Sequence, residues 1–283
     1  MLFVMVAVLG MLSILPFVTP AECVGESCSA GINLTVDNIA PVINGVFPVS
    51  AITLNGGTVS EIVVDFNVTD ENGWGDIDDQ KYSVILTRGG EETRYQKNGS
   101  CGFFDFHDDN TIIVRCSVEM QFYDGEGAWN ISVSANDTAG ETATNDSTGT
   151  TVNALDYVSQ DVISAIWGSV TLGTDDEEAD NTVTLTNGGN QVYTSFDLTG
   201  QASTGELYSS VIDANKFSVD SDTGQTTGQI YMVDNTPVDV SSLLSLSTRG
   251  ADVTEEIFFY ADIPLSIRAD TYISDSAWDI QLA

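Results

Sequence analysis

Eleven residues, "DENGWGDIDDQ" at positions 70 to 80, hold the densest set of side chains suited to chemistry. Asp70, Asn72, Asp76 and Asp78 bring hard oxygen donors together here, and Ca²⁺ takes about six to eight such oxygens. The spacing departs from that of an EF-hand, because Trp74 stands where a third oxygen ligand would fall. We therefore predict an irregular calcium site formed by Asp70, Asn72, Asp76 and Asp78. A tight turn between strands, with its acids in solvent, is the alternative.

Two other stretches could bind ligands. Residues 173–181, "GTDDEEADN", form a charge run that is typical of a solvated loop and could also collect cations. Residues 101–110, "CGFFDFHDDN", join three phenylalanines to His107, the one histidine of the chain. Such a loop could bind a sugar or a protein partner, or its rings could cover the side of a β-sandwich.

The sequence offers no recognisable catalytic motif. It lacks Gly-x-Ser-x-Gly, a phosphate-binding loop and HExxH. A hydrolase triad needs a base held beside a nucleophile, and nothing in the sequence pairs His107 with one. Acidic pairs are too common in this composition to single out a glycosidase pair. We predict that the chain is not an enzyme and that it has no cofactor, apart from calcium if the site above binds it.

The chain contains four cysteines, at positions 23, 28, 101 and 116. An even number favours disulfides in an oxidising compartment. The natural pairing joins Cys23 to Cys28 and Cys101 to Cys116. Zinc is the alternative, but these spacings differ from those of paired CxxC knuckles.

Residues 1–21 predict a secretory signal peptide. An apolar run precedes Pro16 and would span roughly 22 Å as a helix, less than the roughly 30 Å of a hydrocarbon core. Small residues at Thr19 and Ala21 fit a signal-peptidase site before Glu22. The run lacks a preceding Lys or Arg, so an uncleaved anchor is the alternative. We expect an extracellular or cell-surface location.

The segment "AWNISVSANDTAG", residues 128–140, alternates apolar and polar side chains. A period of two is typical of a strand with one buried and one solvated face. Asn130 and Asn136 belong to the polar face, and each begins an Asn-x-Ser/Thr glycosylation signal. The predicted glycosylation sites are Asn33, Asn67, Asn98, Asn130, Asn136 and Asn145.

Short alternating runs separated by Gly, Asn, Asp and Ser recur after residue 30, which predicts an all-β chain of antiparallel sandwiches. The expected divisions are a signal peptide at 1–21, a disulfide loop and tether at 22–37, a first domain at 38–153 and a second at 154–283. Residues 31–41, with Ile32, Leu34 and Val36 alternating, could be a first strand, a tether, or a strand donated to a neighbouring subunit. The run 155–167 is ambiguous between a strand and a short helix.

Charge restricts the partners of the chain. It has 42 acidic and 8 basic side chains, a formal net charge of −34 at pH 7. An acidic surface repels phosphate backbones and anionic lipid headgroups, so we expect neither nucleic-acid nor direct anionic-membrane binding. The expected partners are the chain itself or other envelope proteins, with glycans as a further option.

Three stretches carry a resemblance to a known family: "DNIAPVINGVFP", "VDFNVTDENGWGDID" and "AWNISVSANDTAG". They resemble immunoglobulin-like modules of archaeal and bacterial cell-surface proteins, and the second half is similar to a β-sandwich domain of uncharacterised archaeal surface proteins. The resemblance implies an all-β fold of two tandem immunoglobulin-like antiparallel β-sandwiches after an N-terminal signal peptide. It implies location and fold, and it does not imply chemistry.

These patterns favour an exported, glycosylated structural protein of the cell surface, such as a subunit of a surface layer, an appendage or a stalk. The alternative is an adhesin-like binding module for glycan, protein or calcium. A structural subunit should self-assemble, whereas a binding module should stay monomeric and retain a ligand.

Overall fold

The computed structural model describes residues 34–224, 228–274 and 276–283. The predicted signal peptide, the predicted Cys23–Cys28 disulfide and the sequon at Asn33 lie outside these residues. Residues Asn38–Ala283 form one compact unit, and the chain up to Asp37 belongs to a separate one. The described residues contain no helix long and apolar enough to cross a membrane.

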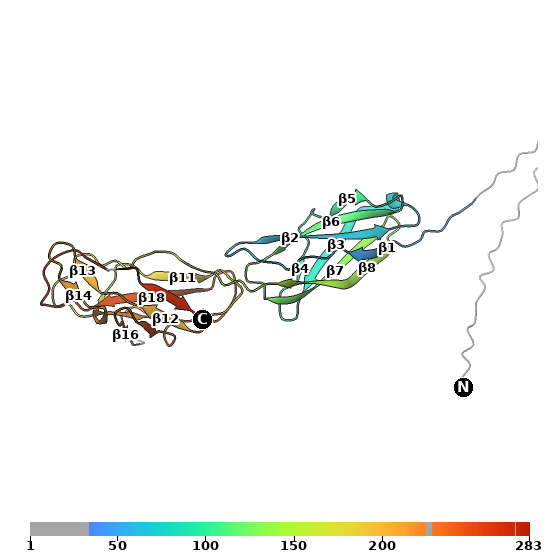
Figure 1. Cartoon of the computed structure of the whole chain (residues 1–283). Coiled ribbons are helices and arrows are strands. Elements are labelled where there is room, and N and C mark those ends of the chain that lie inside the picture. The colour runs from blue at the N-terminus through green and yellow to red at the C-terminus, as the bar shows by residue number, and fades with distance from the viewer. Residues whose placement is uncertain (1–33, 225–227, 275) are drawn as a thin grey trace, which may run out of the picture. The chain divides into compact units, whose positions relative to one another are not determined.

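The first half of the compact unit consists of two four-stranded antiparallel sheets (Figure 1). One has the strand order β1-β2-β6-β5 and the other the order β4-β3-β7-β8. The elements are β1 (Val42–Val46), β2 (Ser60–Thr69), the 3-10 helix η1 (Trp74–Asp76), β3 (Ile77–Thr87), β4 (Arg94–Tyr95), β5 (Gly102–Phe106), β6 (Thr111–Met120), β7 (Gly127–Asp137) and β8 (Thr142–Val152).

Alternation along the strands explains why these two sheets form a sandwich. In β2 the side chains of Val64, Phe66 and Val68 are fully buried, while the intervening residues face outward. Strands β2 and β6 pair in unbroken register from Ser60↔Met120 to Thr69↔Thr111. A period of two sends one face of each sheet into a shared core, in which Trp129 of β7 is among the largest fully buried side chains. We call this region the first sandwich.

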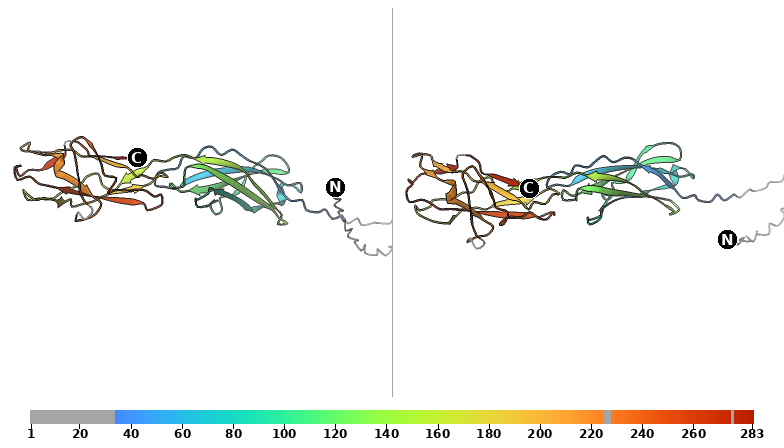
Figure 2. Two further views of the ribbon diagram at one scale, coloured as in Figure 1. Left: turned by 90° about the horizontal axis from the view of Figure 1, so that it is seen from below. Right: turned by 60° about the horizontal axis from the view of Figure 1, so that its bottom comes forward.

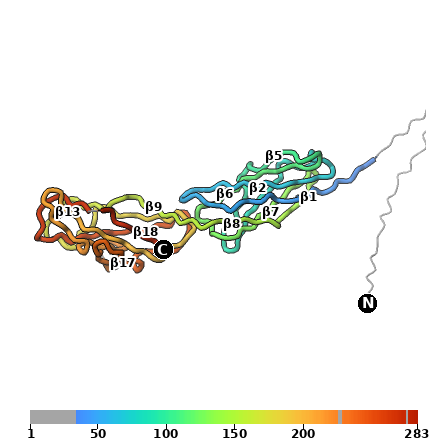
Figure 3. Tube along the Cα trace, viewed as in Figure 1, coloured from blue at the N-terminus to red at the C-terminus, as the bar shows by residue number. Residues whose placement is uncertain are grey.

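The second half contains shorter strands, which Figure 3 traces after β8. They are β9 (Val158–Gln160), β10 (Glu177–Glu178), β11 (Val183–Asn187), β12 (Phe196–Thr199), β13 (Ser203–Gly205), β14 (Val211–Ile212), the 3-10 helix η2 (Ala214–Lys216), β15 (Phe217–Asp220), β16 (Ile230–Tyr231), β17 (Pro237–Asp239), β18 (Thr254–Ala261), β19 (Tyr272–Ser274) and β20 (Asp279–Leu282). The ambiguous run 155–167 becomes the strand β9 followed by irregular chain.

These strands form one larger sheet, β16-β15-β18-β11-β9 with β10 also on β18, and two three-stranded sheets, β17-β12-β20 and β14-β13-β19. Strand β18 is central, and its residues from Ile257 to Ala261 are buried without interruption. A strand covered on both faces needs such a continuous apolar run. We call this region the second sandwich; Figure 2 shows both regions in two further views.

The prediction of an all-β fold of antiparallel sandwiches is confirmed. Every strand pair described is antiparallel, and one isolated bridge, between Ile52 and Val152, is parallel. The two halves have separate clusters of buried hydrophobic residues. The predicted division after residue 153 falls between Val152, the last buried residue of the first cluster, and Ala179, the first of the second.

Candidate metal centre

Three carboxylates from separate parts of the first sandwich meet at one point. Asp70 directly follows β2, Asp76 ends η1, and Asp137 ends β7. Each offers an oxygen, and these oxygens lie within 4.8 Å of one another. Asp70 and Asp137 are buried, and Asp76 is partly buried. We call these three residues the carboxylate cluster.

Backbone hydrogen bonds fix the loop between β2 and β3. The N–H of Gly73 donates to the carbonyl oxygen of Asp70 at 3.0 Å. The N–H of Asp76 donates to the carbonyl oxygen of Gly73, also at 3.0 Å. Gly73 has a φ of 103°, which side chains of L-residues rarely tolerate. The chain therefore turns back within six residues and brings Asp76 beside Asp70. Thr138 then fastens Asp76 to the end of β7, since its N–H donates to the Asp76 carbonyl at 2.7 Å.

Asp70 is the least satisfied member of the cluster. Its Oδ1 accepts a hydrogen bond from the N–H of Asn72 at 2.8 Å, whereas its buried Oδ2 has no hydrogen-bond partner. Burial raises the pKa of the Asp70 carboxyl; the Asn72 N–H opposes the rise, and the charges of Asp76 and Asp137 add to it. Leaving one oxygen of a buried carboxylate without a partner costs stability, and a bound cation would supply the missing interaction.

Asp137 is well satisfied by comparison. The side-chain amide of Asn38 donates to its Oδ2 at 2.7 Å, and the N–H of Glu141 donates to its Oδ1 at 2.8 Å. The hydrogen bond from Asn38 is the main cause that lowers the pKa of Asp137. This carboxylate therefore keeps its negative charge beside Asp70, which makes the cluster more attractive to a cation.

The donor set fits a hard divalent cation. Carboxylate oxygens are the ligands that Ca²⁺ and Mg²⁺ prefer, and the cluster contains neither sulfur nor imidazole. Ca²⁺ tolerates irregular geometry, whereas Mg²⁺ demands a near-octahedral arrangement. Three carboxylates on a loop and two strand ends therefore suit Ca²⁺ better than Mg²⁺.

Two of the four predicted metal ligands belong to the cluster, namely Asp70 and Asp76. Asn72 lies beside it, and its Oδ1 accepts the N–H of Ile39 at 2.8 Å. Asp78 has other partners: the N–H of Gln80 at 3.0 Å, which lowers its pKa most, and the ammonium of Lys81 at 3.3 Å. Asn72 and Asp78 as metal ligands stay predictions.

The sequence interpretation missed Asp137. This residue falls inside both a strand and a glycosylation signal, although "NDTAG" stands at the end of a strong alternating run. An acid at such a strand end lies at the end of a sheet, where the loop that connects the two sheets can reach it. Within the described residues no second group of three potential metal-binding side chains meets in this way, and the charge run 173–181 forms none.

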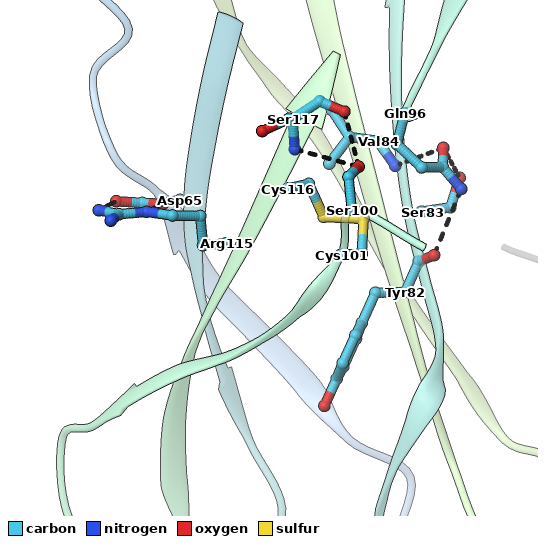
Figure 4. The surroundings of a disulfide bond; sticks show 10 residues. All are labelled: Asp65, Tyr82, Ser83, Val84, Gln96, Ser100, Cys101, Arg115, Cys116 and Ser117. Atoms are coloured by element: carbon cyan, nitrogen blue, oxygen red, sulfur yellow. Dashed lines mark hydrogen bonds and ion pairs between the residues drawn. A yellow bond between two sulfur atoms is a disulfide. The ribbon is translucent and has the colours of Figure 1, made fainter. Parts of the chain in front are cut away.

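The disulfide between Cys101 and Cys116 is present and confirms that pairing (Figure 4). It joins the residue before β5 to a fully buried position of β6, with the two Cα atoms 4.0 Å apart. Beside it, Ser100 Oγ donates to the carbonyl oxygen of Ser117 at 2.8 Å. These bonds hold the aromatic stretch 102–106 as the edge strand β5.

The aromatic rings of β5 remain about half exposed. Phe103 and Phe106 have ring centroids 4.6 Å apart, and Trp74 of η1 packs edge-to-face on Phe106 at 5.1 Å. Phe104 lies under the guanidinium of Arg115, which also pairs with Asp65 at 2.7 Å. Trp74 and Phe106 thus join the loop of the carboxylate cluster to β5.

The predicted glycosylation sites differ in accessibility. Asn98 and Asn130 are exposed, whereas Asn67, Asn136 and Asn145 are partly buried. The side-chain oxygen of Asn67 is buried without a hydrogen-bond partner, although the alternation of β2 directs this residue outward. Of the described sequons, Asn98 and Asn130 are the most open to a glycan.

Comparisons with known proteins identify no family. No protein-family model matches the chain, and no curated protein matches it. A solved structure of the Streptococcus agalactiae AgI/II polypeptide BspA C-terminal domain aligns with 85% of this chain and 89% of its own, at 11% identity and a TM-score of 0.21. The secreted serine protease VesC from Vibrio cholerae aligns with 82% of this chain and 49% of its own, at 11% identity and a TM-score of 0.19. Similarity at this level carries no argument about function.

Proposed function

We propose that this chain is an exported structural protein of the cell surface, in which a calcium ion stabilises one end of the first sandwich. The observation that supports the cation is the buried Oδ2 of Asp70, which has no hydrogen-bond partner beside the carboxylates of Asp76 and Asp137. Extracellular calcium is typically millimolar, and extracellular modules bind it with a Kd of about 0.1–1 mM. The ion is therefore matched to the proposed location.

The structural role rests on composition and fold. Two β-sandwich regions, a net charge of −34 and exposed sequons on the first sandwich suit a glycosylated wall, appendage or stalk. The expected partners are further copies of the chain or other envelope proteins. The absence of catalytic motifs in the sequence supports a non-enzymatic role. Electron microscopy with millimolar calcium and then with chelator tests assembly: ordered sheets or filaments support the structural role, and dispersed monomers in both conditions contradict it.

The second candidate function is an adhesin-like binding module. Trp74, Phe103 and Phe106 favour it, because these neighbouring rings are about half exposed. A contiguous patch of exposed apolar side chains can mark a binding site. Retention of the monomeric protein on a glycan array, lost in Phe106→Ala, would support this function over the structural one.

The cation site is tested by thermal unfolding in 10 mM Ca²⁺ and in chelator. At about 10 to 100 times Kd, calcium should stabilise the protein by about 1.4–2.7 kcal/mol. Asp70→Asn should abolish this gain, because a ligand charge is lost. In chelator the same variant should be as stable as the wild type or more so, because a buried uncompensated charge has been removed.

Asp109→Asn is the matched control, since it removes one exposed acid of the first sandwich outside the cluster. It should keep the full calcium response. An equal calcium response in the wild type and in Asp70→Asn would contradict the proposed site, as would a wild type without any response.

A further inference from the structure

The second sandwich contains a large and almost uncharged cavity of about 870 Å³. Its aromatic wall includes Trp167, Phe217, Phe259 and Trp278, whose neighbouring rings have centroids 5.6 to 5.7 Å apart. Only two of its 30 lining residues, Arg268 and Asp270, are charged. In a chain with net charge −34, this is a surface that another acidic molecule can approach with little repulsion.

The cavity lies between sheet edges that lack a neighbouring strand. Among the described strands, β9 pairs with β11 alone, β19 with β13 alone and β20 with β12 alone. All three edges contribute to the lining, through Gln160, Ile273 and Ile280. Unpaired strand edges beside an apolar cavity form a template for one more β-strand.

The chain also carries a segment suited to fill this place. Leu34 and Val36 are 80% and 74% exposed, and they are two residues apart, so an extended chain directs both side chains to the same face. The stretch "GINLTV" at 31–36 has no charge, and Asp37 is the first acid after it. An uncharged strand entering a cavity whose two charged lining residues have opposite signs meets little of the repulsion that opposes contact between copies of this protein.

We propose that the segment around Leu34 and Val36 of one copy adds as a β-strand to the second sandwich of another copy, between β9 and the β19–β20 edge. Backbone hydrogen bonds to the edges would give the pairing, and Leu34 and Val36 would enter the cavity. Repetition of this head-to-tail contact makes a filament. The inference rests on the structural role proposed above, because it names the partner of that role as a second copy.

A photo-crosslinking amino acid placed at Leu34 of the full chain, as the host processes it, tests the contact directly. Irradiation of the assembled protein should give dimers, with cross-links by mass spectrometry in residues 160–167 or 272–280. Cross-links confined to the first sandwich would overturn the proposal. A lipid or other small molecule that co-purifies in the cavity and persists in assembled protein would also overturn it.

Substitutions at Leu34 and Val36 measure how much this segment contributes to assembly. Leu34→Asp with Val36→Asp should raise the concentration needed for assembly roughly tenfold or more, because two apolar side chains are lost and two charges enter the cavity. Val59→Asp with Val63→Asp is the matched control, since it adds the same charge at exposed valines of the first sandwich. Sedimentation velocity measures the concentration at which each double variant assembles. An equal rise in that concentration for both double variants would overturn the proposal.

The outcomes separate this inference from the proposed function. Assembly that survives Leu34→Asp with Val36→Asp overturns the donated strand and leaves the structural role intact. A wild type that stays monomeric at every concentration overturns both. A wild type that calcium does not stabilise, but that still gives the predicted cross-links, overturns the cation site and supports the donated strand.

Discussion

The two sandwiches share a fold class but solve the packing of their cores in different ways. In the first, strands of ten or eleven residues such as β2, β3 and β7 run the length of the sheets, and alternating side chains fill the core. In the second, most strands are two to five residues long, and the wall beside the cavity is irregular chain. Long continuous strands close a core, whereas broken strands leave edges and space for a partner.

The two regions also differ in their use of charge. The carboxylate cluster lies where three distant segments of the first sandwich converge, and Asp70 there has a buried oxygen without a partner. The cavity of the second sandwich is nearly free of charge. The proposed cation site therefore belongs to the first region, and the proposed self-association belongs to the second.

The largest expected effect comes from removing the core tryptophan of the first sandwich. Trp129 is 1% exposed, and its Nε1 donates to the carbonyl oxygen of Gly125 at 2.9 Å. Trp129→Ala should cost about 3–5 kcal/mol, because a large cavity opens in a closed core. Trp278→Ala, at the partly buried wall of the cavity, should cost no more than about 2 kcal/mol. Hydrogen exchange read separately on β6 and β18 measures both, and equal costs would break the comparison between the two cores.

The disulfide should matter next, and only to the first sandwich. It closes a loop of 15 residues, for which the loss of chain entropy in the unfolded state predicts about 3 kcal/mol. Cys101→Ala with Cys116→Ala should lower the urea midpoint of the first sandwich accordingly, with hydrogen exchange in β18 unchanged. Reductant added to the wild type is the control and should reproduce the shift. A loss shared by both sandwiches would show that they unfold as one.

The smallest effect is a pH dependence of the calcium response. The pKa of Asp70 is raised, so its carboxyl binds a proton more tightly in the folded state than in the unfolded state. Without calcium, the ionised Asp70 therefore lowers the free energy of unfolding. That loss is recovered as pH falls through the raised pKa. Protonation also competes with calcium. In calcium the stabilisation should therefore fade as pH falls through the raised pKa of Asp70, with a slope of at most about 1.4 kcal/mol per pH unit for one proton. In chelator, protonation of Asp70 should instead make the protein more stable as pH falls.

Asp137 acts at lower pH, since its pKa is lowered by Asn38. Its contribution to stability is present above its unfolded pKa and is lost as pH falls through the folded value. Hydrogen exchange in β7 and β18, measured across pH with and without calcium, reports the stability of each sandwich. It therefore shows whether the contributions of Asp70 and Asp137 rise or fall with pH. A calcium response of β18 that follows the same pH curve would contradict the assignment of the cation to the first sandwich.

Much of the first sandwich could be predicted from local sequence. The alternation at Val64, Phe66 and Val68, and again around Trp129, determines strands with one buried face, because side chains of a strand point alternately to its two sides. The Cys101–Cys116 pairing was also predictable, since the two cysteines bracket a short segment between neighbouring strands. The second sandwich was less predictable, because strands of two or three residues show no measurable period.

The sequence by itself determined the all-β class, the acidic surface and the loop that supplies Asp70 and Asp76. Only the tertiary structure decided that Asp137, from a distant strand end, completes the cluster, while Asp78 turns to Lys81 and Gln80. It also decided that the edges of β9, β19 and β20 border one cavity. The physical reason is the same in both cases. The local pattern of apolar and polar residues decides toward which face of its strand a side chain points. The packing of the sheets decides which strand ends and edges, distant in sequence, come together.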